Sequence, residues 1–197
     1  ISDLGVFSVA REAVPDMEIH VSTQANNTNY MSAKMWYSLG AKRIVAAREL
    51  SLEEIKELRK NIPADMEIET FVHGAMCISY SGRCLLSNYL TGRDANHGEC
   101  AHPCRWKYYL MEDTRPGEYM PVFENERGTY IYNSKDLCMI EYIPQLVEAG
   151  IQSLKIEGRM KTPFYVGTVI KAYREAIDDY LESPEKYESR KNYYIEE

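Results

Sequence analysis

The chain has 197 residues, of which 45% are apolar and 27% are charged, and its formal net charge is −7. These values are typical of a soluble globular protein that is large enough for one domain with a real core. No apolar run approaches the length of a membrane span, and the first residues lack the basic and apolar regions of a signal peptide, so we expect no membrane contact. The acidic balance also argues against general adhesion to nucleic acids.

Strands and helices are predicted to alternate along the first 72 residues. Residues 29–39 are typical of a helix, and Gly40 after them suits a left-handed helix end. Ser51 begins a second helix, because Glu54 three positions later completes a capping box. Short apolar segments predict three strands, at residues 19–22, 43–46 and 66–72.

Residues 73–128 break this alternation, because glycine, cysteine, arginine and tyrosine recur there without a clear period. A long irregular insertion in a compact domain is usually functional or disordered, and the aromatic and cysteine content argues against disorder. We therefore expect a cysteine-rich insertion. From Gly82 to Lys107 it carries four basic and two acidic residues, so a basic patch for an anionic substrate and a solvated surface both stay open.

The alternation resumes after the insertion, with a strand at residues 130–132, a helical stretch that ends at Gly150 and a strand at residues 153–157. Thr162 is predicted to cap a long helix that has Pro163 at its first position. The buried stripe of that helix is predicted to consist of Val166, Val169, Ile170, Tyr173, Ile177 and Tyr180.

This order of elements predicts the βαβ repeat of a parallel α/β fold. Five strands and a stub at residues 1–5 are fewer than the eight strands of a closed (β/α)8 barrel. An open sheet is the alternative, but we favour a TIM-barrel-like (β/α)8 domain that lacks its first strands, because the chain begins at what resembles a strand's end. We expect the partial barrel to span residues 1–182, and residues 183–197 to be a polar tail that leads to an absent C-terminal region.

Cysteine gives the strongest chemical signal, with four of five cysteines in 28 consecutive residues, at Cys77, Cys84, Cys100 and Cys104. Without a secretory signal we expect a reducing, cytoplasmic compartment, where disulfides are a poor default. Four thiolates suit an iron–sulfur cluster or a tetrahedral zinc ion, although the paired C-x2-C of a zinc ribbon is missing. His73, His97 and His102 keep a mixed zinc site open, and a buried free thiol is the alternative, above all for Cys138.

The cysteines lie within a longer motif, in which Glu69 and Phe71 precede Gly-small-x-Cys, and Gly-x-Cys-x-aliphatic-Ser follows and ends at Ser87. This motif resembles the signature of peptidase family U32, the collagenase-like peptidases. The flanking segments fit as well, so the likeness covers nearly the whole chain. They are Gly-Arg-Asp-Ala-Asn at 92–96, Cys-Ala-His-Pro-Cys-Arg at 100–105, Asn-Ser-Lys-Asp-Leu at 133–137 and Lys-Ile-Glu-Gly-Arg-Met-Lys at 155–161.

The resemblance implies a modified (β/α)8 barrel and a role in RNA modification. Better-understood relatives resemble RNA- or quinone-hydroxylation proteins that hold an iron–sulfur cluster through four cysteines. Segments 133–137 and 155–161 are most similar to the branch that hydroxylates the wobble uridine of tRNA, using prephenate, whereas another branch acts on a cytidine of ribosomal RNA. We therefore expect an iron–sulfur-dependent RNA-modification protein whose partners are tRNA or other RNA, and prephenate.

The resemblance also implies a ligand set for a cluster of the four-iron, four-sulfur type. The ligands carried over by position are Cys77, Cys84, Cys100 and Cys138, and Cys104 competes with Cys138 for the fourth place. Some relatives resemble zinc proteins that take His and Cys from two subunits. His73 with Cys77 is therefore an alternative zinc pair, and a homodimer stays open.

The family name implies a peptidase, for which the sequence offers little chemistry. It has neither the H-E-x-x-H pair of zinc proteases nor a G-x-S-x-G elbow. A cysteine nucleophile would need His73 or His102, but the clustered cysteines fit ligation better. We expect an enzyme for RNA hydroxylation first, a peptidase with a peptide substrate second, and a metal-stabilised binding domain without catalysis third.

Polar residues at predicted strand ends are candidate substrate contacts. Lys155, Glu157 and Arg159 lie at or just past one end, while His73 and Asn133 follow two others. Chemistry in a (β/α)8 barrel sits at these carboxyl ends. Lys155 and Arg159 would hold a carboxylate, and an ion pair between Lys155 and Glu157 is the structural alternative.

Aromatic residues crowd the same region, with eight of the 16 tyrosines between Tyr80 and Tyr142, alongside Trp106. Stacked against Arg83, Arg93 and Arg105, these rings are able to receive the unpaired bases of an RNA loop. A small satellite core around the cysteines is the favoured alternative, because aromatic residues dominate burial.

Overall fold

The computed structural model describes residues 1–77, 79–80, 83–106, 108–121, 124–125, 128–129 and 136–196. The chain divides into two compact units. We call Ile1–Gly74 together with Leu137–Glu197 the sheet unit, and Ala75–Asp136 the cysteine unit.

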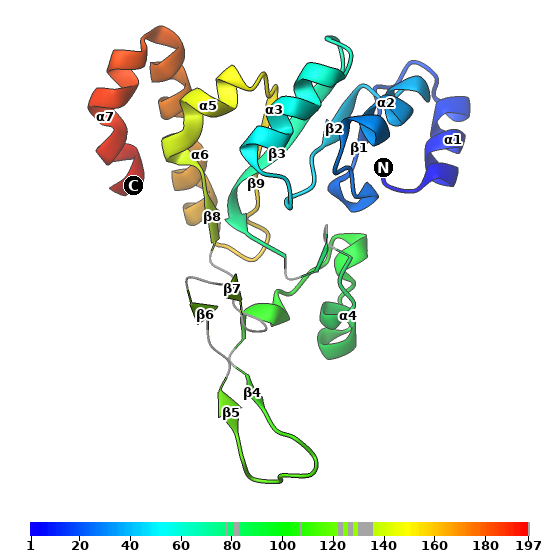
Figure 1. Cartoon of the computed structure of the whole chain (residues 1–197), viewed down its shortest axis with the longest axis vertical. Helices are drawn as coiled ribbons and strands as arrows, with labels where there is room; N and C mark the ends of the chain where they lie inside the picture. Colours follow the sequence, from blue (N-terminus) through cyan, green and yellow to red (C-terminus); the bar gives the residue numbers. More distant parts are fainter. Residues whose placement is uncertain are drawn as a thin grey trace. The chain divides into compact units, whose positions relative to one another are not determined.

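The sheet unit is built on a parallel sheet (Figure 1). Its strands are β1 (His20–Val21), β2 (Arg43–Val45), β3 (Glu67–Ala75), β8 (Asp136–Cys138) and β9 (Ser153–Ile156). The pairs β1–β2, β2–β3 and β3–β9 are parallel, which confirms the predicted α/β class. Ile1 lies beside β1, because its amino group donates to His20 O at 2.8 Å, but a helix begins at Leu4, so the predicted strand stub at residues 1–5 is wrong beyond its first residues.

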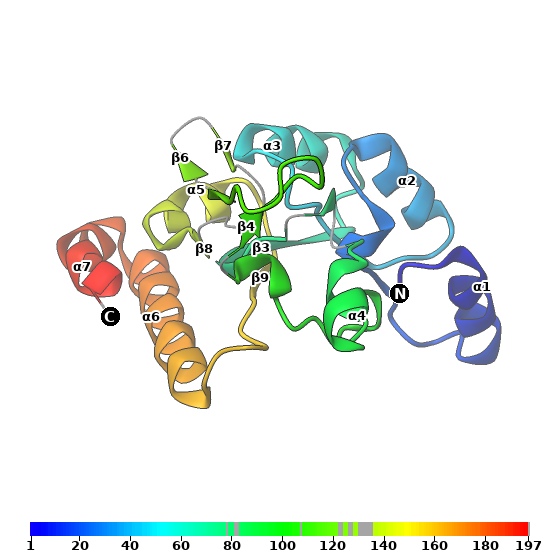
Figure 2. The ribbon, with the colours of Figure 1, turned by 90° about the horizontal axis from the view of Figure 1, so that it is seen from below.

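Helices follow one another in an arc outside this sheet (Figure 2). They are α1 (Leu4–Ala13), α2 (Tyr30–Ser38), α3 (Leu52–Asn61), α5 (Ile143–Glu148), α6 (Pro163–Glu182) and α7 (Pro184–Glu196), with short 3-10 turns at Thr23–Ala25 and Ile140–Tyr142. The predicted capping box is confirmed, because the Glu54 carboxylate accepts from Ser51 N at 2.7 Å. The Thr162 hydroxyl caps α6 as predicted, by accepting from Tyr165 N at 3.2 Å.

Two apolar clusters lie between the sheet and the helices. Ile44 and Ile68 belong to the first, with residues of α1, α2 and α3, and Val72 belongs to the second, with residues of α5, α6 and α7. Burying such a side chain contributes about 1.5–3 kcal/mol. Because side chains alternate along a strand, Glu67 and Glu69 of β3 point to the face opposite Ile68 and Val72.

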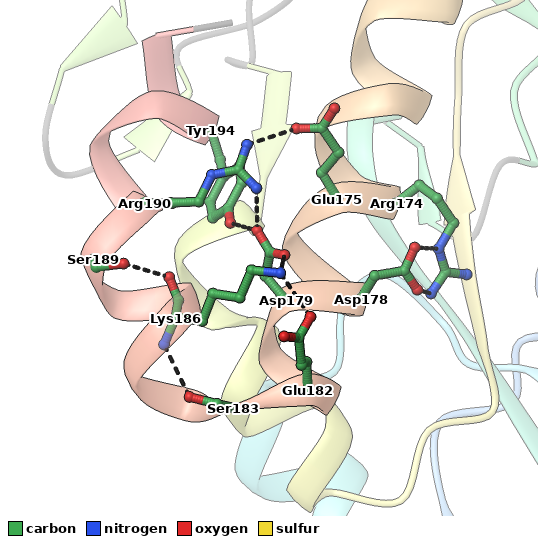
Figure 3. A network of polar contacts seen from close by, with 10 residues as sticks. All are labelled: Arg174, Glu175, Asp178, Asp179, Glu182, Ser183, Lys186, Ser189, Arg190 and Tyr194. Carbon is green, nitrogen blue, oxygen red and sulfur yellow. Dashed lines mark hydrogen bonds and ion pairs between the residues drawn. The ribbon is translucent and has the colours of Figure 1, made fainter.

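Helices α6 and α7 pack through the ring pair of Tyr180 with Tyr187 and through a buried carboxylate, whose contacts Figure 3 shows. Asp179 on α6 accepts from Lys186 Nζ at 2.8 Å and also contacts Arg190 and Tyr194, all three from α7. The hydrogen bond from Lys186 and the one from Tyr194 lower the pKa of Asp179 to about 2. The segment expected as a polar tail therefore forms a helix whose Tyr187 is buried.

In the described part of the cysteine unit, the elements of regular structure are short. It contains α4 (Leu86–Thr91), 3-10 turns at Ala95–His97 and Pro103–Arg105, and two antiparallel pairs, β4 (Tyr109–Leu110) with β5 (Met120–Pro121) and β6 (Glu124–Asn125) with β7 (Gly128–Thr129). The strand predicted at residues 130–132 and the candidate Asn133 lie outside the described residues.

Candidate functional site

The face of the sheet opposite the helices carries charged side chains. Glu67, Glu69 and Phe71 share this face on β3 because strand side chains alternate. The parallel register places Arg43 of β2 next to Glu67, and Ser153 and Lys155 of β9 next to Glu69 and Phe71. Polar groups from three strands thus converge on one surface of the sheet unit.

Glu69 is the centre of this polar network. Its carboxylate accepts from Ser153 Oγ at 2.8 Å, lies 3.4 Å from Lys155 Nζ and lies 3.5 Å from the Arg43 guanidinium. Arg43 also donates through Nε to Glu67 at 2.8 Å, and this bond lowers the pKa of Glu67. The Glu69 side chain is only 14% exposed, so these partners offset much of the cost of its burial.

Phe71 lies under two cations. The Arg48 guanidinium, in the loop after β2, sits 4.0 Å from the ring centroid of Phe71, and Lys155 Nζ sits 5.1 Å from it. The Phe71 side chain is buried, so the ring is a fixed platform. Lys155 and the Arg48 loop both lie at the carboxyl ends of parallel strands, where α/β proteins bind ligands.

The end of β3 packs tightly against the segment after β9. Gly74 has a φ of +100°, and a Cβ atom there would lie 2.1 Å from the backbone oxygen of Glu157. Glu157 N donates to His73 O at 2.9 Å, and the Glu157 carboxylate accepts from Arg159 N at 3.0 Å. Lys155 forms an ion pair with Glu69. The ion pair between Lys155 and Glu157 stays a prediction.

His73 lies among aromatic side chains of α6. Its Nε2 lies 2.8 Å from the Tyr165 hydroxyl, and its ring packs edge-on against Tyr173. The Tyr173 hydroxyl donates to Val72 O at 2.7 Å and accepts from Met139 N at 2.9 Å, which joins β3 to the residue after β8. Burial raises the pKa of Tyr173, and the neighbouring Cys138 thiol raises it further. Tyr173 therefore has His73 and Cys138, two predicted ligands, as neighbours.

The other four cysteines belong to the cysteine unit, where Cys84 is buried and Cys77, Cys100 and Cys104 are half-buried. Leu86 N donates to Cys84 Sγ and His102 N donates to Cys100 Sγ, each at 3.3 Å. Ser87 Oγ accepts from Ala101 N at 3.0 Å, so the serine of the motif ties α4 to the loop of Cys100.

These cysteines fit a metal or cluster in donor chemistry. No disulfide joins the five cysteines to one another, and an amide that donates to sulfur favours the thiolate form that ligation requires. Among the described residues, however, no three side chains of His, Cys, Asp or Glu gather closely enough to hold a metal ion. The fit therefore lies in the type of ligand and not in an assembled geometry.

Aromatic residues of the cysteine unit lie on its surface. Exposed fractions are 53% for Tyr80, 86% for Tyr89, 48% for Trp106 and 67% for Tyr109. The satellite core favoured from the sequence is wrong for these four rings. Several large rings that are exposed to water in one unit are available for contact with a partner.

Sequence reasoning missed several residues of the sheet unit's polar face and strand ends. Arg48 and Tyr165 were not singled out, and Tyr173 was expected only as part of a buried stripe. Ile170, placed on the same stripe, is 50% exposed. Glu69 and Phe71 carried a signal, since both belong to the motif that ends at Ser87, but their partners are set by strand register, which one sequence does not contain.

The whole chain, residues 1–197, matches the profile of peptidase family U32. The chain belongs to peptidase family U32. It is 44% identical to the tRNA hydroxylation protein P of Escherichia coli (strain K12), over 91% of this chain and 48% of that protein. It is 46% identical to an uncharacterized protease of Methanocaldococcus jannaschii, over 100% of this chain and 47% of that protein.

A third family relative is a 23S ribosomal RNA 5-hydroxycytidine synthase of Escherichia coli, which is 35% identical over 92% of this chain and 26% of that protein. The chain spans about half the length of the first two relatives. No solved structure matches it. In the part of the chain that the structure describes, every helix is too short or too polar to cross a membrane.

Proposed function

We propose that the protein containing this chain takes part in hydroxylation of the wobble uridine of tRNA, in the cytoplasm and with prephenate as co-substrate. The observation that carries the proposal is the similarity of 91% of the chain to a protein named for tRNA hydroxylation, at 44% identity. The ribosomal RNA relative supports the same reaction class, hydroxylation of a pyrimidine in RNA. The exposed rings of the cysteine unit support contact with unpaired bases.

The proposed cofactor is an iron–sulfur cluster of the four-iron, four-sulfur type. Cys77, Cys84, Cys100 and Cys138 would hold it, with Cys104 as the alternative to Cys138. Support comes from the amide–sulfur bonds at Cys84 and Cys100 and from the family's sequence pattern, and not from any distance between the two units. A cluster of this kind supplies one-electron transfer when bound. The alternative is a zinc site that uses His73 and Cys77. Because such a site takes its ligands from two subunits, this alternative also requires a homodimer.

The proposed architecture is a partial (β/α)8 barrel over residues 1–182 with the cysteine-rich insertion at about 73–128. The parallel strands and the arc of outer helices support a barrel. In this proposal the polar face of the sheet is the lumen, and Lys155 and Arg159 contact a carboxylate substrate. Glu157 holds the Arg159 backbone, because its carboxylate accepts from Arg159 N.

A peptidase is the second candidate function. The observation that favours it is the name of the Methanocaldococcus jannaschii relative, together with the family's own name. A cysteine nucleophile paired with His73 or His102 would be its chemistry. A metal-stabilised binding domain without catalysis is the third.

The test is complementation of an Escherichia coli strain that lacks its tRNA hydroxylation proteins. The complete protein, expressed in that strain, is expected to restore the hydroxylated wobble uridine that mass spectrometry detects in digested tRNA. Cys84→Ser is expected to abolish the product, while Ser81→Ala, which lies between Cys77 and Cys84 in the sequence, serves as the matched control. Absence of the nucleoside, when the strain's own protein restores it, would contradict RNA hydroxylation, and peptide cleavage by the purified protein would then favour the peptidase.

A further inference from the structure

We propose that the guanidinium of Arg105 donates hydrogen bonds to sulfur atoms of the iron–sulfur cluster and thereby raises the reduction potential of that cluster. The inference deepens the proposed function, because it rests on the cluster proposed above and adds Arg105 to the residues that contact it. It starts from two buried nitrogen atoms of Arg105 that have no acceptor among the described residues.

The position of Arg105 is fixed by a short 3-10 turn in the cysteine unit, which begins at Pro103 and contains Cys104. Arg105 N donates to His102 O at 3.0 Å, which closes the turn. Pro103 is buried, and its carbonyl oxygen accepts from the Tyr108 hydroxyl at 2.8 Å. The backbone that carries Arg105 is therefore held in place directly after a cysteine.

The guanidinium of Arg105 has more donors than the described residues satisfy. Its Nη1 forms an ion pair with Asp136, which belongs to the same unit. Its Nε and Nη2 are buried, and neither has a hydrogen-bond partner in the part of the chain that the structure describes. Burying a donor without an acceptor costs about 1–3 kcal/mol, and more for a charged group. The fold therefore favours an additional acceptor at these two nitrogen atoms.

The neighbouring chemistry identifies sulfur as that acceptor. In the same unit, the sulfur atoms of Cys84 and Cys100 each accept a hydrogen bond from a backbone amide at 3.3 Å. Hydrogen bonds to sulfur and the local charge are the means by which a protein adjusts the potential of an iron–sulfur cluster. A charged donor such as a guanidinium makes a stronger bond than a backbone amide does. Arg105 would therefore be a strong donor in a set that the amides begin.

Burial of the two nitrogen atoms argues against a substrate as their acceptor. Nε and Nη2 of Arg105 have almost no contact with solvent, although the whole side chain is 22% exposed. A carboxylate or phosphate that arrives from solvent would have to move the side chain before it reached them. A cluster held by cysteines is part of the interior of its domain, so it meets these atoms where they are.

The test is a redox titration of the complete protein, purified without oxygen, in which electron paramagnetic resonance follows the reduced cluster. Reduction adds negative charge, so the loss of a cationic donor disfavours it. Arg105→Gln is expected to lower the equilibrium constant for one-electron reduction roughly tenfold, which lowers the potential by about 59 mV. Arg115→Gln is the matched control, because Arg115 belongs to the same unit and also pairs with a carboxylate, that of Glu112, but is 54% exposed. It should leave the potential unchanged.

Arg105→Lys keeps the charge and loses the planar fork, so it is expected to lower the potential by less than Arg105→Gln does. It decides the matter if Arg105→Gln fails to fold or to hold the cluster. Unchanged potentials in the Arg105 variants, or an equal shift in Arg115→Gln, would overturn the inference and leave the cluster in place. Wild-type protein without iron and sulfide would overturn the inference together with the proposed cofactor. No hydroxylation is measured, so a failure of that proposed activity is a separate result.

Discussion

The sheet unit and the cysteine unit bury their side chains in different ways. In the sheet unit, strands and helices enclose two apolar clusters, and its polar groups meet partners from other elements. In the cysteine unit, large rings stay exposed and short turns hold the cysteines through backbone–sulfur and serine–backbone bonds. The first arrangement is stable through packing, whereas the second is typical of a segment that completes its contacts with a ligand or a partner.

Paired substitutions at glycine give the largest expected contrast between the two units. Gly74→Ala places a Cβ atom 2.1 Å from the Glu157 backbone at a φ of +100°, and we expect a loss of roughly 3–5 kcal/mol in the free energy of unfolding. Gly92 in the cysteine unit has a φ of +71° with nothing within 4 Å of that position, so Gly92→Ala should cost about 1 kcal/mol. Urea unfolding followed by circular dichroism measures both, and equal losses would contradict the tighter packing of the sheet unit.

Sequence patterns predicted the sheet unit where local chemistry decides structure. Ser51 with Glu54 and Thr162 with Pro163 are local signals, and both helices begin where they indicate. Helix α1 was missed although Asp3 caps it, because an apolar start was interpreted as a strand end. Helix α7 was missed because its polar sequence hides tyrosines that are buried only in the folded chain, against α6 and the turn at Ile140–Tyr142.

Less of the candidate site was predictable. The thiols and Lys155 are visible in the sequence as residue types, but the contact of Lys155 with Glu69 depends on a strand pairing 84 residues apart, as does that of Ser153 with Glu69. Arg48 has no local signal, since it becomes notable only over the Phe71 ring. A single sequence shows the residue types, but it does not show which residues of distant strands pair with one another.

A second contrast compares buried and half-buried tyrosine hydroxyls. Tyr173→Phe removes one hydrogen bond to Val72 O and one from Met139 N inside the sheet unit, and we expect a cost of about 1–3 kcal/mol. Tyr108→Phe in the cysteine unit removes one bond to Pro103 O and should cost about 1 kcal/mol or less. Chemical denaturation of both variants checks this order, which a larger loss for Tyr108→Phe would reverse.

A third effect is a dependence of stability on acid. The folded pKa of Asp179 is about 2, below its ordinary value of 3.8, so its contribution is present above about pH 4 and is lost as the pH falls through 2. We expect Asp179→Asn to flatten the loss of stability between pH 4 and 2. Asp178→Asn, which removes an exposed pair with Arg174 on the same helix, is the control and should leave the slope as it is. Urea unfolding midpoints measured across this pH range test the prediction. If stability falls equally steeply with pH in the wild type and in Asp179→Asn, the stabilising role of the buried carboxylate is contradicted.

The central proposal, that the cysteines of this chain hold an iron–sulfur cluster, is tested most directly by chemical analysis. Iron, zinc and acid-labile sulfide are measured in the complete protein after purification without oxygen, beside its visible spectrum. The account predicts a brown protein with matched iron and sulfide, and loss of both in Cys77→Ser and Cys84→Ser. Zinc without sulfide, or full iron and sulfide in both variants, would contradict it.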